Sequence, residues 1–281
     1  MKITISHQLT LPLGSGNSRT VEHVLLTPIS GPSQRVKDWS IDMPGMDSAA
    51  RFLDAFGNRA LLVSQGKPEG SIVIAVKGEV ETIDRNGVLA RLTGDPVIAL
   101  YKRVTPLTKP DPRILDQFHD ADRRSGRIAL FHGIMERIAE LYRFGDAQPA
   151  AMEASGVHSQ TQTGQSQSQD TAEPDGREEA DAATFAHAFI GTVRALDIPA
   201  RYVTGYLAGD EDRQAAFHAW AEAYDDSLGW IGFDAALGIC PIDRHIRVAA
   251  GLDALSTQPV RLVPADGEPA TGSVSIEAVA Q

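Results

Sequence analysis

Apolar and polar residues alternate along the first third of the chain, and Gly, Pro and Asn residues separate the alternating segments. This pattern is typical of strands that bury one face. We predict strands over residues 2–11, 20–27, 34–41, 60–64, 71–82 and 88–93, with a hairpin turn at 56–58. Strands at this spacing favour an antiparallel β-sandwich over residues 1–105.

The spacing of apolar residues becomes helical after Pro112. We predict a short helix around Ile114 and longer helices over 128–141 and 178–196. Strands follow at 201–207, 217–224 and 230–234. The predicted fold class is therefore α+β, with a second domain over 106–255 and an extended tail of one or two strands over 256–281.

Residues 147–178 interrupt the second domain with a segment rich in Gln, Ser and Thr. A segment with so few apolar side chains buries too little surface to offset the entropy of ordering it. We predict a mobile loop there, with regulation or partner binding as an alternative role.

Composition narrows the possible partners and compartment. The formal charge of -11 argues against nucleic-acid and anionic-membrane partners, because both select basic surfaces. Cys240 is the only cysteine, which excludes an intramolecular disulfide. The N-terminal segment lacks the unbroken apolar stretch of a signal peptide, and no run is long enough to span a membrane. We expect a soluble, cytoplasmic protein; its oligomeric state is left open.

Two titratable residues, His218 and Asp234, are predicted to meet on one face of a hairpin. A turn centred near Ser227 places them on diagonal positions of neighbouring strands, about 7–8 Å apart. A histidine oriented by a carboxylate is the base and acid part of a nucleophilic triad, although a structural His–Asp pair fits the spacing equally well. We predict no metal or cofactor.

Three stretches carry a family resemblance: FAHAFIGTVRALDIPARYVTGYL, AFHAWAEAY and GWIGFDAALGICPIDRHIRVAAGLD. They resemble the transglutaminase-like family of bacterial proteins, whose core is similar to that of papain-type cysteine proteases. VEHVLLTPISGPSQRVKDWSIDM and LDAFGNRALLVS resemble the β-rich domain that often precedes this core. The resemblance implies helices packed on an antiparallel sheet after the sandwich.

The family's catalytic histidine corresponds to His218 and its acid to Asp234, and its nucleophilic cysteine falls on Ala182. The family pattern Gly-Val-Cys-Gln-Asp-Phe-Ala-His aligns with ADAATFAH at 180–187. A thiol at a helix N-terminus has a lowered pKa, whereas alanine has no atom that can attack a carbonyl. The neighbouring residues differ as well, which indicates a naturally degenerate site.

Other residues near this site are predicted to have structural roles and not catalytic ones. Cys240 is predicted to be a small apolar side chain in a loop. Thr184 lies roughly 200° around the helix from Ala182 and should point away from His218. His187 is assigned a packing role.

The charged residues beside the helix and after the core are predicted to cap the helix or to face solvent. Asp181 and the acidic pair at 178–179 are predicted to cap the helix. Residues 243–245 are predicted to form solvated surface.

The leading hypothesis is a catalytically inactive protein that binds a peptide, an amide ligand or a partner protein through an Ala182–His218–Asp234 cleft. One alternative is an active amide-bond hydrolase that uses Cys240 or water activated by His218. The other is a structural scaffold with a closed cleft.

Overall fold

The computed structural model describes residues 1–13, 18–67, 70–91, 96–118, 126–145, 176–210, 213–264 and 271–279. The predicted low-complexity loop lies outside these residues, except for 176–178. No helix within the described ranges is long and apolar enough to cross a membrane.

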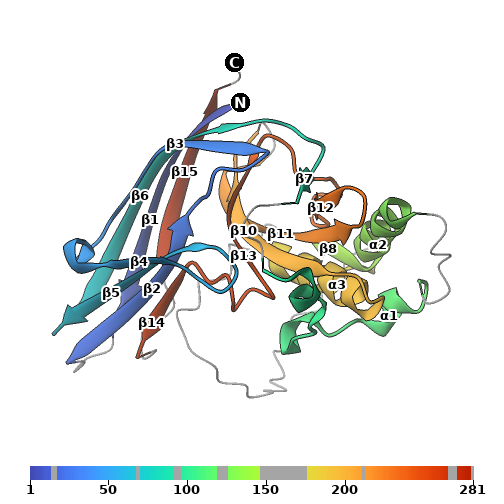
Figure 1. Cartoon of the computed structure of the whole chain (residues 1–281), viewed down its shortest axis with the longest axis horizontal. Helices are drawn as coiled ribbons and strands as arrows, with labels where there is room; N and C mark the ends of the chain where they lie inside the picture. Colours follow the sequence, from blue (N-terminus) through green and yellow to red (C-terminus); the bar gives the residue numbers. More distant parts are fainter. Residues whose placement is uncertain are drawn as a thin grey trace.

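Two four-stranded antiparallel sheets form a sandwich at one side of the molecule (Figure 1). The first sheet has the order β15 (Thr271–Val279), β1 (Lys2–Pro12), β6 (Ser71–Thr82) and β3 (Gln34–Asp42). The second has the order β14 (Val260–Val263), β2 (Arg19–Thr27), β5 (Arg59–Gly66) and β4 (Ala50–Leu53). The predicted sandwich is confirmed, although β4 was not predicted.

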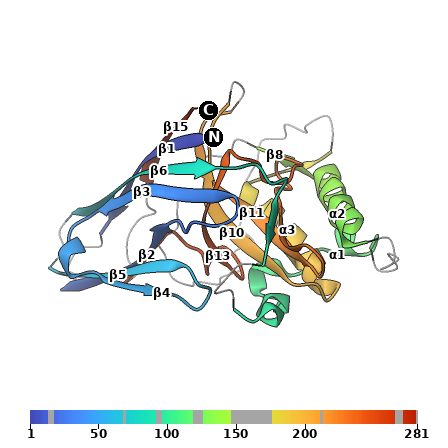
Figure 2. The same cartoon turned by 45° about the horizontal axis from the view of Figure 1, so that its top comes forward.

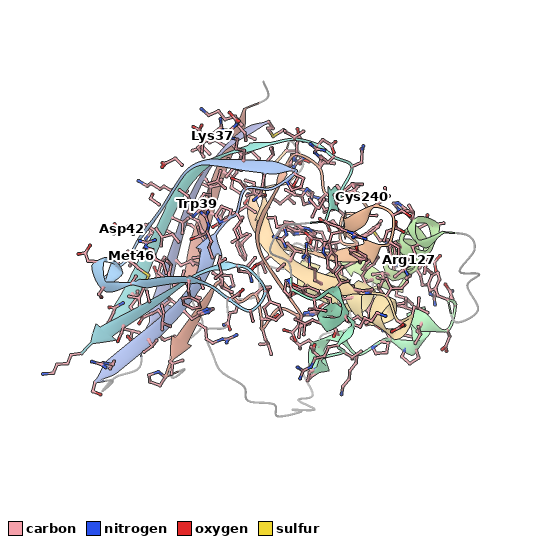
Figure 3. All side chains as sticks on the ribbon, in the orientation of Figure 1. Lys37, Trp39, Asp42, Met46, Arg127 and Cys240 are labelled. Carbon is pink, nitrogen blue, oxygen red and sulfur yellow. The ribbon has the colours of Figure 1, made fainter. Side chains whose placement is uncertain are left out.

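The core of the sandwich follows from the alternation in its strands. Inward-facing apolar side chains of both sheets form one buried cluster: Leu9, Leu11, Val24, Leu26, Met43, Leu61, Val63, Ile72, Ile74, Val76, Val260 and Leu262. Trp39, labelled in Figure 3, packs against this cluster and donates from Nε1 to Leu26 O at 2.9 Å. A side chain at Gly78 would have its Cβ 2.1 Å from the indole ring, so only glycine fits beneath Trp39.

The predicted hairpin turn at 56–58 joins β4 to β5. The carboxylate of Asp54 accepts hydrogen bonds from the backbone N–H groups of Phe56 and Asn58, both at 2.8 Å. Gly57 has a φ of 82°, which glycine adopts without strain.

A five-stranded antiparallel sheet forms the second part of the fold, in the order β13-β10-β11-β12-β7. Its strands are β7 (Val88–Ala90), β10 (Ala200–Leu207), β11 (Ala216–Asp225), β12 (Gly229–Phe233) and β13 (His245–Gly251). Helices α1 (Pro112–Leu115), α2 (Arg127–Leu141) and α3 (Ala182–Ala195) lie on the side away from the sandwich (Figure 2). The α+β fold class is thus confirmed.

Short elements complete this part of the fold. Strands β8 (Tyr142–Phe144) and β9 (Glu178–Ala180) form a parallel pair. The 3₁₀ turns η2 (Ile98–Lys102) and η3 (Pro106–Thr108) lie in connections of this part, whereas η1 (Met46–Ser48) connects β3 to β4 in the sandwich.

Small residues on β11 allow α3 to pack closely against it. Ala219, Ala221 and Ala223 share a buried cluster with Phe185 and Phe189 of α3. Side chains on β11 alternate between the two faces of the sheet, so His218 and Trp220 belong to the opposite set. The helix therefore covers the alanine face.

Two sequence predictions differ from the structure. Of the segment predicted at 88–93, residues 92 and 93 lie outside the described residues, and β7 (Val88–Ala90) pairs with β12 and not with the sandwich. The helix predicted from residue 178 begins at Ala182, because residues 178–180 form β9. The division into three domains stays a prediction, but the tail at 256–281 contributes β14 and β15 to the two sheets of the sandwich.

Two amide side chains of the sandwich bind the outer edge of β13. Asn58 Nδ2 donates to Ala250 O and Asn58 Oδ1 accepts from Ala250 N, both at 2.8 Å. Gln34 makes the same pair of 2.8 Å bonds with the backbone of Arg247. Each amide takes the place of a residue on a neighbouring strand, and together they fix the sandwich against the sheet.

Candidate functional site

His218 and Asp234 meet as the hairpin register predicted. Ala221 lies opposite Phe233 in the β11–β12 pair, which centres the hairpin on Ser227. His218 Nε2 lies 2.7 Å from Asp234 Oδ2. Both side chains are buried, with 5% exposure for His218 and none for Asp234. The structure therefore supplies a hydrogen-bonded pair, while a catalytic role for it stays a prediction.

A second histidine, His245, reaches the same carboxylate oxygen. Its Nε2 lies 3.1 Å from Asp234 Oδ2. His245 is buried at the first position of β13, so the prediction that 243–245 form solvated surface is wrong for this residue. Gly205 of β10 makes room here, since a Cβ at that position would lie 2.0 Å from Ile246 O and 2.6 Å from the Trp220 ring.

The carboxylate of Asp234 is fully buried yet stays ionised. Burial by itself raises its pKa, but the interactions with His218, and then with His245, outweigh burial and hold the pKa well below its usual range. The other carboxylate oxygen, Oδ1, accepts from Leu237 N at 3.2 Å. Each oxygen of Asp234 is thus hydrogen-bonded.

One backbone donor fixes the protonation of the His245 ring. Ile242 N donates to His245 Nδ1 at 3.2 Å, so Nδ1 carries no proton. In the neutral ring the proton is then on Nε2, where it is donated to Asp234. Nδ1 of His218, by contrast, has no hydrogen-bond partner in the part of the chain that the structure describes.

The ligating atoms of His218, Asp234 and His245 lie within 4.8 Å of one another, a spacing that a metal ion could bridge. Two histidines and one carboxylate are a familiar ligand set for zinc and non-haem iron. A ligating nitrogen needs a free lone pair, however. His245 would have to release either the Ile242 N–H or its own Nε2 proton, so the present hydrogen bonds do not fit a metal.

The start of α3 carries the predicted nucleophile position. Ala182 is the first residue of the helix, and Asp181 is its N-cap. The Asp181 carboxylate accepts from Thr184 N at 2.8 Å and from Thr184 Oγ1 at 2.6 Å. Capping by Asp181 is confirmed, but Glu178 and Glu179 instead pair with Arg113 and Arg143.

Phe144 connects the helix start with the histidine. Its ring centroid lies 6.2 Å from that of His218 and 6.2 Å from that of Phe185 on α3. Phe144 is also the strand partner of Ala180, two residues before Ala182. The aromatic ring therefore contacts both the imidazole and the first turns of α3.

Comparison with known proteins agrees with this arrangement. Residues 139–235 match the transglutaminase-like superfamily, and residues 3–81 match the bacterial transglutaminase-like N-terminal region. The chain contains a transglutaminase-like core after a bacterial transglutaminase-like N-terminal region. Its transglutaminase-like core contains α3, β11 and β12, and the matched N-terminal region is part of the sandwich.

Two individual proteins are similar to this transglutaminase-like chain. A candidate cysteine protease from Cytophaga hutchinsonii is 20% identical, with a TM-score of 0.60, over 99% of this chain and 89% of that one. This likeness shows the fold alone. An uncharacterized protein of Mycobacterium leprae (strain TN) is 30% identical over 83 residues, which are 27% of this chain and 29% of that protein.

Cys240, the only thiol of this transglutaminase-like protein, lies in the loop after β12 (Figure 3). The Cys240 side chain is half-buried against the core that faces the helices. It also packs closely on Gly87, since a Cβ placed on Gly87 would lie 2.9 Å from the Cβ of Cys240. Burial raises the pKa of the Cys240 thiol. These features agree with the predicted packing role and disfavour a thiolate.

His187 also has the predicted packing role. Its ring stacks on Tyr202 with centroids 4.8 Å apart, and its Nε2 accepts from Ala254 N at 3.1 Å. Burial lowers the pKa of His187 to about 4. The ring is therefore neutral at pH 7 and serves as an acceptor inside the core.

Proposed function

We propose that this transglutaminase-like protein is non-catalytic and binds a peptide, an amide ligand or a segment of a partner protein beside His218. The observation that carries the proposal is Ala182 at the first position of α3, where the family resemblance puts the nucleophile. A methyl group cannot form an acyl-enzyme. His218 and Asp234 are nevertheless kept in hydrogen-bonded contact at 2.7 Å.

The first turn of α3 supports the proposal. In a thiol enzyme, the positive end of the helix dipole stabilises the thiolate. In this protein, the Asp181 carboxylate caps that helix end through Thr184 N and Oγ1. A negative charge fixed at the cap disfavours a second one forming beside it.

A ligand for this site must suit His218. The imidazole donates from Nε2 to Asp234, which leaves Nδ1 as an acceptor. An amide N–H or an ammonium group is the complementary donor. Phe144 beside the imidazole adds an aromatic surface against which an apolar part of such a ligand could pack.

The burial of the site favours a second candidate, a scaffold with a closed cleft. His218 exposes only 5% of its surface. The cavity beside His245 is about 20 Å³ and is lined also by Trp220, Pro241 and Arg247. Such a cavity has room for about one water molecule. A larger hollow of about 390 Å³, between His23, Phe56 and Leu255, contains no residue of the His218 cluster.

Substitution of the nucleophile position tests the proposal. We expect no turnover of peptide or glutamine-amide substrates by the unmodified chain, and turnover by the Ala182→Cys variant. Adding His218→Ala should lower that turnover by about 10²–10⁴-fold, the usual contribution of a general base. A Cys240→Ser background excludes the natural thiol. Turnover by the unmodified chain that disappears with His218→Ala would refute the proposal, and inactivity of every variant would favour the scaffold.

A further inference from the structure

We propose that His245 is a positioning residue, whose Nε2–H holds the Asp234 carboxylate in place and thereby fixes His218 as the tautomer that presents an unprotonated Nδ1 to a ligand. The ligand at Nδ1 rests on the proposed function, whereas the tautomers of the two rings do not. The tautomers do not depend on whether the protein is catalytic.

The position of the His245 ring is constrained from three directions. Its backbone is held in the sheet, where His245 is the strand partner of Leu207. Its ring stands edge-on to Trp220, with centroids 5.3 Å apart. Its Nδ1 accepts from Ile242 N. A ring held in this way offers a single N–H, and that group is directed at Asp234 Oδ2.

The hydrogen bond from His245 Nε2 limits the carboxylate of Asp234 to accepting hydrogen bonds. Oδ2 receives both histidine N–H groups, at 2.7 and 3.1 Å, and Oδ1 receives Leu237 N. A carboxylate with these bonds is a pure acceptor and does not take the Nε2 proton of His218. The exchangeable position of His218 is then Nδ1, and Asp234 cannot turn away without losing two bonds at once.

The consequence is a preference for one class of ligand. Nδ1 of His218 lacks a partner among the described residues, on a side chain that is more than nine-tenths buried. An unprotonated ring nitrogen that no protein group occupies can accept a hydrogen bond from a ligand. The site therefore selects N–H and O–H donors over carboxylates and other pure acceptors.

The tautomers can be measured directly in the unmodified chain. Selective ¹⁵N labelling of histidine and long-range ¹⁵N–¹H NMR, above the ordinary pKa of histidine, distinguish protonated from unprotonated ring nitrogens. We expect both His218 and His245 to carry the proton on Nε2. A proton on Nδ1 of His245 would overturn the proposal without any substitution.

A matched pair of substitutions separates the two hydrogen bonds of His245. In His245→Gln, the amide N–H replaces Nε2–H toward Asp234, while the bond to Ile242 is lost. In His245→Asn, the amide oxygen replaces Nδ1 toward Ile242, while the bond to Asp234 is lost. We expect His218 to stay a single Nε2–H tautomer in the glutamine variant and to become a mixture of tautomers in the asparagine variant. An unchanged His218 tautomer in folded His245→Asn would contradict the proposal.

Thiol reactivity gives an independent chemical measurement. In an Ala182→Cys, Cys240→Ser chain, His245→Asn should slow alkylation by iodoacetamide at neutral pH by about tenfold, because a disordered base activates the thiol less well. His245→Gln should retain the rate within about twofold. Equal slowing by both variants would argue against positioning. If the tautomers are as expected but the introduced thiol reacts no faster than an ordinary cysteine, then the assignment of position 182 to the nucleophile is wrong.

Discussion

One carboxyl group lies inside the sandwich, far from the charged surface of the protein. Glu22 is fully buried on the same face of β2 as Val24 and Leu26, which belong to the sandwich core. Burial raises the pKa of Glu22, and the neighbouring side chains of Thr20 and Gln65 oppose this shift only in part. The group therefore resists ionisation in the folded state.

This burial gives a pH dependence with a definite sign. An unfolded glutamate ionises near pH 4.3, about the model-peptide value. Above that pH the unfolded state releases its proton before the folded state does, so the contribution of Glu22 to stability falls as pH rises through the window up to its raised pKa. Glu22→Gln should make the chain more stable than the unmodified protein at pH 7, and the advantage should vanish below about pH 4.

Urea unfolding at several pH values checks this expectation. Glu277→Gln, at an exposed position of β15, is the matched control and should leave the pH profile unchanged. If Glu22→Gln is still more stable than the unmodified protein by the same amount at acid pH, then the stability difference comes from packing and not from ionisation of Glu22.

His218, Asp234 and His245 show what sequence can and cannot predict at the level of single residues. The contact between the first two follows from alternation along two strands joined by one short turn. His245 reaches the same carboxylate only because β13 pairs with β10, far from it in sequence. Local pattern does not specify that pairing, so the polar run before His245 was interpreted as surface.

At the level of elements, the outer edge of β13 is closed by side chains. Gln34 and Asn58 each donate and accept one backbone hydrogen bond with a β13 residue. An exposed strand edge is a template for pairing with other chains. These amides satisfy buried backbone groups and occupy that edge.

Removing one amide should therefore cost more than the loss of an average polar side chain. Gln34→Ala leaves the N–H and C=O of Arg247 without the partners they have now. We expect the free energy of unfolding to fall by about 2 kcal/mol, as for buried polar groups left unpaired. Gln8→Ala, at an exposed position of the same sandwich, should change it by less than about 0.5 kcal/mol. Equal effects in urea unfolding would mean that the edge contacts contribute little.

Element boundaries in the core were predictable only in part. Helix-favouring residues continue from α3 back to Glu178, but Asp181 caps the helix and residues 178–180 pair with β8. Similarly, the apolar residues of β7 fit either sheet, and β12 offers the available edge. Composition alone does not rank two possible partners for a short apolar strand.

At the level of the whole molecule, the last strands complete the first domain. β14 pairs with β2, and β15 pairs with β1, whose other edge binds β6. Val260 and Leu262 of β14 belong to the buried sandwich core. The sandwich therefore needs residues from both ends of the sequence, and the period-two pattern at the N-terminus gave no sign of this.

Truncation tests how far the sandwich depends on these strands. A chain ended after residue 255 lacks β14 and β15 and should be less stable by several kcal/mol, since each buried aliphatic side chain contributes about 1.5–3 kcal/mol. A chain ended after residue 264 keeps β14 and should be intermediate. Urea unfolding and binding of a hydrophobic dye measure the two effects. Equal stability of all three chains would show that the first six sandwich strands suffice.

The pairing of β1 with β15 also determines the order in which the protein can be completed at the ribosome. Lys2 pairs with Val279, and Figure 1 shows the two ends side by side. β1 is synthesised well before β15, so its outer edge stays unpaired until the later strand is made. The intervening helices and the five-stranded sheet can fold earlier, because their contacts are closer in sequence. Until β15 emerges, the nascent chain carries an open sheet edge that a chaperone or another chain could occupy.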